Sequence, residues 1–147
     1  MYKEMSSKFN RELWNIGRGI EDAIKPKIDK YFGCEFARSD DIYDVMDFCD
    51  EDKKIVVEIK GRRIPSTQYE DTIITANKIT EGLIKMEHGY KVFLFFVFTD
   101  KVLYHQLKED DEFVMKITGT FQKPHYLLPI KNLKEFDENN LNHNKDE

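Results

Sequence analysis

The segment from residue 47 to residue 63, DFCDEDKKIVVEIKGRR, constrains the fold more than any other part of the chain. Residues 55–59 are β-branched apart from Glu58, which is typical of a β-strand. The charged residues before them predict a tight turn. The segment is therefore expected to form a β-hairpin with arms at about 42–49 and 53–60.

Side chains alternate between the two faces of a strand, so Glu58 and Lys60 are expected on one face and Ile59 on the other. If a turn of two or four residues is centred on Glu51 and Asp52, the numbers of two residues that face each other across the hairpin add up to 103. Asp47 then opposes Val56. Asp47 then shares the face of Glu58 and Lys60. Two carboxylates and one amine would thus converge at one strand end, a group that can hold a divalent metal ion and activate a water.

Two alternatives to this interpretation remain open from the residues alone. A three-residue turn would place Asp44, rather than Asp47, on the face of Glu58. A Glu-x-Lys pattern on a strand also occurs by chance, in which case Glu58 and Lys60 would form no more than a surface ion pair.

Length and composition indicate one globular domain. The chain has 147 residues, of which 40% are apolar and 35% charged. No apolar run reaches the roughly 18 residues of a membrane helix, and the N-terminus lacks the apolar region of a signal peptide. The two cysteines, Cys34 and Cys49, have no metal-type spacing, which favours a reducing compartment. We therefore expect an intracellular protein that is not secreted and has no membrane partner.

The charge distribution neither demands nor excludes a nucleic-acid ligand. The net charge is −5, but residues 135–147 hold five acids and one base, so the rest of the chain carries about −1. Basic side chains gather around the predicted hairpin: Lys53, Lys54, Lys60, Arg62 and Arg63. Such a local patch can bind phosphates on a mildly acidic protein.

The first half of the chain predicts two helices around the hairpin. Apolar residues recur at spacings of three and four over 8–31, where Pro26 should kink the helix or start a second short one, and Gly33 should end it. Thr67 and Glu70 have the spacing of a capping box, which predicts a helix from there to about residue 87.

The second half predicts mainly strands. Residues 91–98 are almost all apolar, as in a central strand covered on both faces. Segments 102–107 and 113–119 are expected as edge strands, 124–130 as extended chain, and 133–136 as a helical turn. Residues 1–136 then form a single α/β domain with a mixed central sheet flanked by helices, and 137–147 a disordered acidic tail.

This order of elements, with Asp47 on the second strand and Glu58-x-Lys60 ending the third, resembles the PD-(D/E)xK nuclease superfamily. The resemblance covers residues 10–98 and implies a restriction-endonuclease-like αβββαβ core with trailing edge strands. A closer resemblance spans 40–130, to short nuclease-like proteins encoded by large DNA viruses and phages. It rests on small motifs: Tyr43, Asp47-Phe48, Glu58-Ile-Lys-Gly-Arg-Arg63, Tyr69, Asn77-Lys78, His125 and Pro129-Ile130.

The resemblance implies a role for each site residue. Asp47 and Glu58, with the Ile59 carbonyl, would bind Mg²⁺ or Mn²⁺, and Lys60 would orient or activate the attacking water. Glu21 falls on the first helix, where the superfamily often has a further acid. The residues that would contact DNA phosphates are Arg62 and Arg63 after the strand, and Gln68 and Lys78 on the second helix. Met46 stands where the superfamily name has Pro, which is often absent.

The function that the resemblance implies is Mg²⁺-dependent cleavage of DNA in replication, repair or recombination, in the host cytoplasm or the virion. A homodimer is expected because a duplex has two strands to cut. Two alternatives stand beside it. One is a non-catalytic nucleic-acid-binding or virion protein that retains the nuclease fold, and the other is a structural interaction protein.

Overall fold

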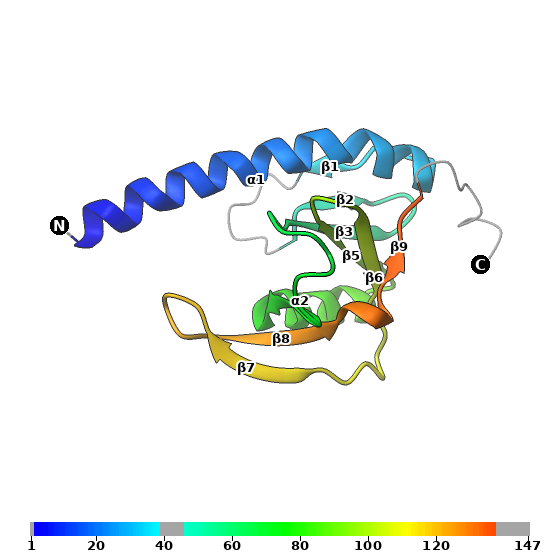
Figure 1. Ribbon diagram of the computed structural model, residues 1–147. Coiled ribbons are helices and arrows are strands. Elements are labelled where there is room, and N and C mark those ends of the chain that lie inside the picture. Colours follow the sequence, from blue (N-terminus) through cyan, green and yellow to red (C-terminus); the bar gives the residue numbers. More distant parts are fainter. Residues whose placement is uncertain (1, 39–45, 138–147) are drawn as a thin grey trace. The chain divides into compact units, whose positions relative to one another are not determined.

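The computed structural model describes residues 2–38 and 46–137 (Figure 1). In these residues the chain forms two α-helices, a six-stranded sheet and a three-stranded sheet. Residues 36–137 make one compact unit, and helix α1 belongs to another. No helix in the described ranges is both long and apolar enough to cross a membrane.

Helix α1 (Tyr2–Phe32) begins earlier than the sequence predicted and runs through Pro26 as one element. Of the two alternatives expected at Pro26, a kink or a second short helix, the second helix is therefore not formed. The helix ends as predicted at Gly33, which has a φ of +70°. There the amide of Gly33 donates to the Lys30 carbonyl and the amide of Cys34 to the Asp29 carbonyl, an arrangement that satisfies the last carbonyls of a helix.

The six-stranded sheet is mixed, as predicted. Its strand order is β1-β2-β3-β5-β6-β9, and only β3 and β5 run parallel. Strands β3 and β5 hold its centre, and both are almost wholly buried. The strands are β1 (Ala37–Arg38), β2 (Phe48–Asp50), β3 (Ile55–Gly61), β5 (Lys91–Val97), β6 (Val102–Gln106) and β9 (Lys134–Glu135).

The hairpin of β2 and β3 forms, but in a different register from the predicted one. Phe48 pairs with Val57, so facing positions sum to 105, because the four-residue turn is centred one residue later than expected. Asp47 comes directly before β2. The same register therefore places it opposite Glu58 and not opposite Val56. The shift is even, so Asp47 keeps the strand face on which it was predicted.

The predicted helix from Thr67 is wrong in its first half. Residues Asp71–Thr75 form strand β4, and helix α2 comprises only Ala76–Glu87. The sequence DTIIT is rich in β-branched residues, and it pairs along its whole length with a later strand, a contact that helix periodicity does not reveal. Tyr69, which lies in the segment predicted as helix, is 63% exposed.

Strand β4 is the first strand of a second sheet that the sequence analysis missed. Its order is β4-β8-β7, all antiparallel, with β7 (Val114–Thr118) at an edge as predicted and β8 (Lys123–Pro129) in the middle. The short helical segment expected at 133–136 lies earlier, as a 3₁₀ turn at Ile130–Asn132, and is followed by β9.

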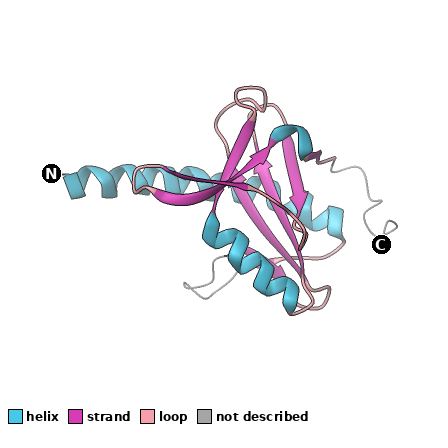
Figure 2. Ribbon diagram, turned by 90° about the horizontal axis from the view of Figure 1, so that it is seen from below, coloured by secondary structure: helices cyan, strands magenta, loops and turns pink. Residues whose placement is uncertain are grey.

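One buried apolar cluster of the larger unit lies between the six-stranded sheet and the elements on one side of it. Figures 1 and 2 show α2 and the three-stranded sheet on the same side of the six-stranded sheet. The side chains that meet there are apolar and buried: Met46, Val56, Ile74, Ile79, Val92, Leu94, Phe96, Phe98, Leu103, Leu107 and Leu128. Their burial packs α2 against β5, the parallel neighbour of β3. From there the Lys78 side chain of α2 reaches Glu58 on β3.

Candidate active site

Glu58 has 0% of its surface exposed, and it is the only buried glutamate or aspartate among residues 18–38 and 46–137. It lies on β3 between β2 and β5 and pairs with Leu94. Its side chain lies on the same strand face as those of Val56 and Lys60, the face from which Lys78 of α2 approaches. A carboxylate in such a position requires partners, because burying an isolated charge costs several kcal/mol.

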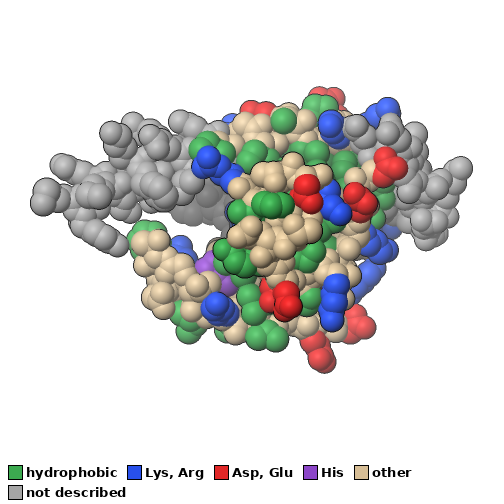
Figure 3. All heavy atoms as spheres, viewed as in Figure 1, with side chains coloured by type: hydrophobic (Ala, Val, Ile, Leu, Met, Phe, Trp, Pro, Cys, Tyr) green, Lys and Arg blue, Asp and Glu red, His purple; other side chains and the backbone are tan. Residues whose placement is uncertain are grey.

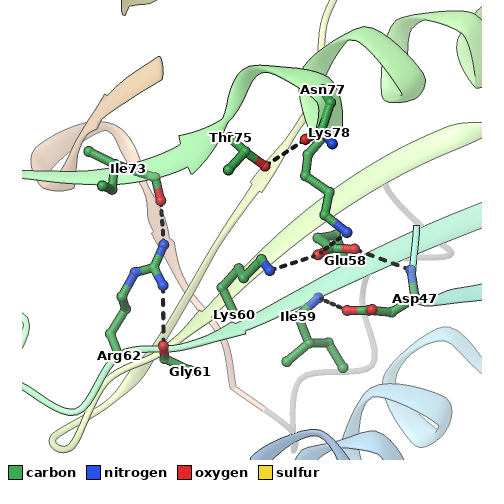
Figure 4. A network of polar contacts seen from close by, with 10 residues as sticks. All are labelled: Asp47, Glu58, Ile59, Lys60, Gly61, Arg62, Ile73, Thr75, Asn77 and Lys78. Carbon is green, nitrogen blue, oxygen red and sulfur yellow. Dashed lines mark hydrogen bonds and ion pairs between the residues drawn. The ribbon is translucent and has the colours of Figure 1, made fainter. Parts of the chain in front are cut away.

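Two hydrogen bonds link Asp47 to the segment Glu58–Ile59 (Figure 4). The Asp47 amide donates to Glu58 Oε2 at 3.2 Å. The Ile59 amide donates to Asp47 Oδ2 at 3.1 Å. Each carboxylate is thus fixed by a backbone amide of the other strand. The pairing holds two like charges side by side, an arrangement that a bound cation would stabilise.

Two lysines face the remaining oxygen of Glu58. The ammonium of Lys78, in the first turn of α2, lies 3.0 Å from Glu58 Oε1, and that of Lys60 lies 3.5 Å from the same atom. The Lys78 side chain is 15% exposed and the Lys60 side chain 36%. Figure 4 shows the two lysines approaching Glu58 from different elements, α2 and β3.

The pKa of Glu58 reflects these surroundings. Burial raises it most, and the neighbouring Asp47 raises it further. Lys78 and Lys60 lower it in part, and the result is a pKa of about 7. Glu58 therefore exchanges its proton near neutral pH, as groups in functional sites often do.

The donor set fits a hard divalent cation such as Mg²⁺. Glu58 Oε1 is buried, and the two ammonium groups beside it do not satisfy it with a hydrogen bond of regular geometry. No cluster of three or more histidine, cysteine, aspartate or glutamate side chains that could share a metal occurs within residues 2–38 and 46–137. Asp47 and Glu58 would thus supply two carboxylates, and the backbone and water the other ligands, as is usual for Mg²⁺.

Arg62, predicted as a phosphate contact, is bonded to its own chain. Its guanidinium donates to Thr72 Oγ1 at 3.1 Å, to the Gly61 carbonyl at 3.3 Å and to the Ile73 carbonyl. It also lies over the Phe96 ring, 5.8 Å from the centroid. Burial lowers the pKa of the guanidinium. Arg62 therefore ties the end of β3 to β4.

The other predicted site residues differ in their placement. Lys78 is on α2, as predicted, and Arg63 is exposed directly after Arg62. Gln68 is not on a helix but exposed in the loop before β4, because α2 begins later than predicted. Glu21 is on α1, in the other compact unit. Asp44, the alternative first carboxylate, lies outside the described residues.

Hydrogen bonds that were not predicted from the sequence shape the loop between β3 and β4. Asp100, in the turn after β5, accepts hydrogen bonds from the Ser66 amide and hydroxyl, both at 2.7 Å. These bonds lower the pKa of Asp100. The Thr99 amide donates to the Ile64 carbonyl in the same region. No local signal connects residues 34 positions apart, so only the fold reveals this support of the strand end next to Lys60.

A family model described as "Phage putative PDDEXK endonuclease" matches residues 15–124, about three quarters of the chain. The match confirms the resemblance inferred from the Asp47, Glu58 and Lys60 pattern. No curated protein and no solved structure matches the chain.

Proposed function

Because the chain belongs to the phage putative PDDEXK endonuclease family, we propose that it is a metal-dependent endonuclease that cleaves DNA phosphodiester bonds in replication, repair or recombination. The observation that carries the proposal is the buried Glu58, hydrogen-bonded to the Asp47 amide and flanked by two lysines. A fully buried carboxylate with a raised pKa is costly for a surface ion pair but suited to a site that gains a cation.

In this proposal Asp47, Glu58 and the Ile59 carbonyl hold a Mg²⁺ or Mn²⁺ ion. When bound, the ion would offset negative charge on the phosphate and lower the pKa of a water. The two hydrogen bonds between the two strands keep the carboxylates in place before the ion arrives, which limits the reorganisation that binding requires.

Lys60 and Lys78 are proposed to have different roles. Lys60 is the more exposed of the two, so it can reach the attacking water or a non-bridging phosphate oxygen with little rearrangement. Lys78 is the more enclosed and the closer to Glu58, and it keeps that carboxylate oriented and partly ionised. Both ammonium groups add positive charge where the transition state gains negative charge.

The phosphate contacts are assigned from exposure. Arg63 and Gln68 are exposed on the chain that leaves β3, next to Lys60 in sequence, and are proposed to contact the DNA backbone. Arg62 is proposed to position them by tying β3 to β4. Glu21 remains a candidate for a further metal ligand. A homodimer is part of the proposal, since a duplex has two strands to cut.

The proposal is tested by incubating the full-length protein with supercoiled plasmid, linear duplex and four-way-junction DNA, each with Mg²⁺, Mn²⁺ or EDTA. Metal-dependent cutting that is lost in Lys60→Ala is expected, and the preferred DNA form would indicate the pathway. If the folded wild-type protein bound DNA but cut none of the three, a non-catalytic binding protein would be the better account.

A further inference from the structure

Strands β7 and β8 form a hairpin that reaches beyond the rest of their sheet. Strand β4 pairs with β8 only as far as His125, which faces Thr75, whereas β7 and β8 continue to the pair Thr118–Lys123. The four loop residues after Thr118 are closed by a hydrogen bond from the Gln122 amide to the Gly119 carbonyl at 3.1 Å. The tip therefore has a defined shape, and Figure 2 shows the hairpin extending away from the six-stranded sheet.

This hairpin carries four of the most exposed large apolar side chains in the described part of the chain. They are Val114, Met115, Ile117 and Phe121, with exposed fractions of 68%, 53%, 62% and 61%. Phe121 is in the tip itself, and the ammonium of Lys123 lies 5.9 Å from its ring centroid. Exposed apolar residues gathered on one projecting element indicate a binding surface.

The charge of this region is opposite to that of the chain as a whole. Residues 113–134 contain four lysines and no aspartate or glutamate. The net charge of the whole chain is −5, so the remaining residues carry −9. Figure 3 shows lysine or arginine side chains and a histidine near the base of the projecting hairpin. A basic segment on an otherwise acidic protein matches a polyanion and not an average protein surface.

The strand register connects the hairpin to the candidate active site. Thr75, His125 and Lys116 face one another across β4, β8 and β7, so their side chains share one face of the sheet. Thr75 is the residue directly before α2, and Lys78 is in the first turn of that helix. Neighbouring strands are about 5 Å apart, so Lys116 lies about 10 Å from Thr75, the rise of about three base pairs.

We propose that the β7–β8 hairpin is a DNA-binding arm that grips duplex DNA beside the cleavage site. Lys116 and Lys123 contact backbone phosphates, and Phe121 at the tip inserts as an apolar wedge between base steps. Proteins that kink duplexes insert such side chains and repay the unstacking with added contacts. The inference rests on the proposed function and deepens it, because the preferred substrate would then be duplex DNA that can be kinked.

A second copy of the chain is the competing occupant of this surface. In the described part of the chain strand β7 has a neighbouring strand on one side only, and such edge strands can pair between molecules. The lysines argue for DNA, since two copies of an acid-free hairpin would bring like charges together.

The arm is tested by binding alone, with EDTA present, so that cutting plays no part. The full-length protein is titrated with a short duplex at several salt concentrations, as wild type, Lys116→Ala/Lys123→Ala and Lys131→Ala/Lys134→Ala. The last variant is the control, because it removes the same charge from exposed positions outside the hairpin. The hairpin variant should reduce the slope of log affinity against log salt by about 2, and the control by much less.

The wedge is tested with a duplex carrying 2-aminopurine, whose fluorescence rises when it is unstacked. Wild type and Phe121→Leu should raise the signal, and Phe121→Ala should not and should bind about tenfold more weakly. The proposal would be overturned if the two lysine variants had equal salt slopes. It would also be overturned if Phe121→Ala bound DNA and raised the 2-aminopurine fluorescence like the wild type. A third contrary result would be that the wild type sediments as a dimer and the hairpin variants as monomers, while DNA binding persists in the variants. If the arm is confirmed but the wild type never cuts, only the nuclease assignment fails.

Discussion

The ammonium of Lys78 lies closer to Glu58 Oε1 than the ammonium of Lys60 does, at 3.0 Å against 3.5 Å. The lysine of the Glu-x-Lys motif is thus not the nearest counter-charge of the buried carboxylate. Helix α2 supplies that charge from its first turn, and Lys60 is the more exposed of the two lysines. The site therefore depends on the packing of α2 against β5 as well as on the hairpin.

Replacing Lys78 with Ala should slow metal-dependent cleavage on the order of 10²-fold, because a preorganised positive charge is lost. It should also move the pH profile to higher pH, since Lys78 is the larger of the two influences that lower the pKa of Glu58. The measurement is the cleavage rate against pH. Lys85→Ala, on the same helix beside Tyr90, is the matched control and should leave the profile unchanged. An identical profile for Lys78→Ala would contradict this role.

The stability of the metal-free protein should depend on the ionisation of Glu58. Its pKa is raised from 4.5 to about 7 in the folded state, so the folded protein binds more protons than the unfolded one between these values. Stability is then lost as pH rises through this window, by about 3 kcal/mol. Glu58→Gln, which cannot ionise, should lack this loss.

Urea unfolding of wild type and Glu58→Gln at pH 5 and pH 8, in EDTA, measures the difference. Adding Mg²⁺ at pH 8 should restore stability to the wild type only, because the cation favours ionised Glu58. If the free energy of unfolding changed with pH in the same way in both proteins, ionisation of the buried Glu58 would not destabilise the fold.

Asp47→Asn should separate metal binding from folding. An amide oxygen can still accept the hydrogen bond from the Ile59 amide, so the hairpin should form. The negative charge is lost, so stabilisation by Mg²⁺ or Ca²⁺ in thermal unfolding should fall strongly. Asp50→Asn, which alters a bond to Lys53 in the hairpin turn, is the control and should respond to metal like the wild type. A normal metal response in Asp47→Asn would favour a different first carboxylate.

Arg62→Met should destabilise the fold by about 2–4 kcal/mol, since it removes three hydrogen bonds and leaves partly buried acceptors on β3 and β4 unsatisfied. Arg63→Met should change stability little and weaken DNA binding instead, because that side chain is exposed. Urea unfolding and DNA titration of the two variants give the comparison. The reverse result would make Arg62 the phosphate contact.

The hairpin, the mixed sheet and β5 could be predicted because their signals are local. β-branched runs, alternation and turn residues specify β2, β3 and β5 without reference to distant chain. Asp47 and Glu58 were correctly predicted to share a strand face although the predicted register was wrong by two residues, because side chains alternate with a period of two.

Strand β4 and the three-stranded sheet could not be predicted for the opposite reason. The segment before α2 is amphipathic enough to continue a helix, and its pairing partner β8 lies about 50 residues later. The inward turn of Arg62 follows from the same pairing, since two of its acceptors, Thr72 and Ile73, exist in place only once β4 has formed. Basic residues next to a motif can therefore be structural.

The central claim is that Asp47 and Glu58 hold a catalytic metal ion, and plasmid cleavage by Glu58→Gln tests it most directly. The rate is measured in Mg²⁺ and Mn²⁺ beside wild type and Glu51→Gln, which removes the same charge from the exposed hairpin turn. We expect cleavage by wild type and Glu51→Gln and none by a folded Glu58→Gln in either metal. Equal, metal-dependent cutting by all three proteins would contradict it.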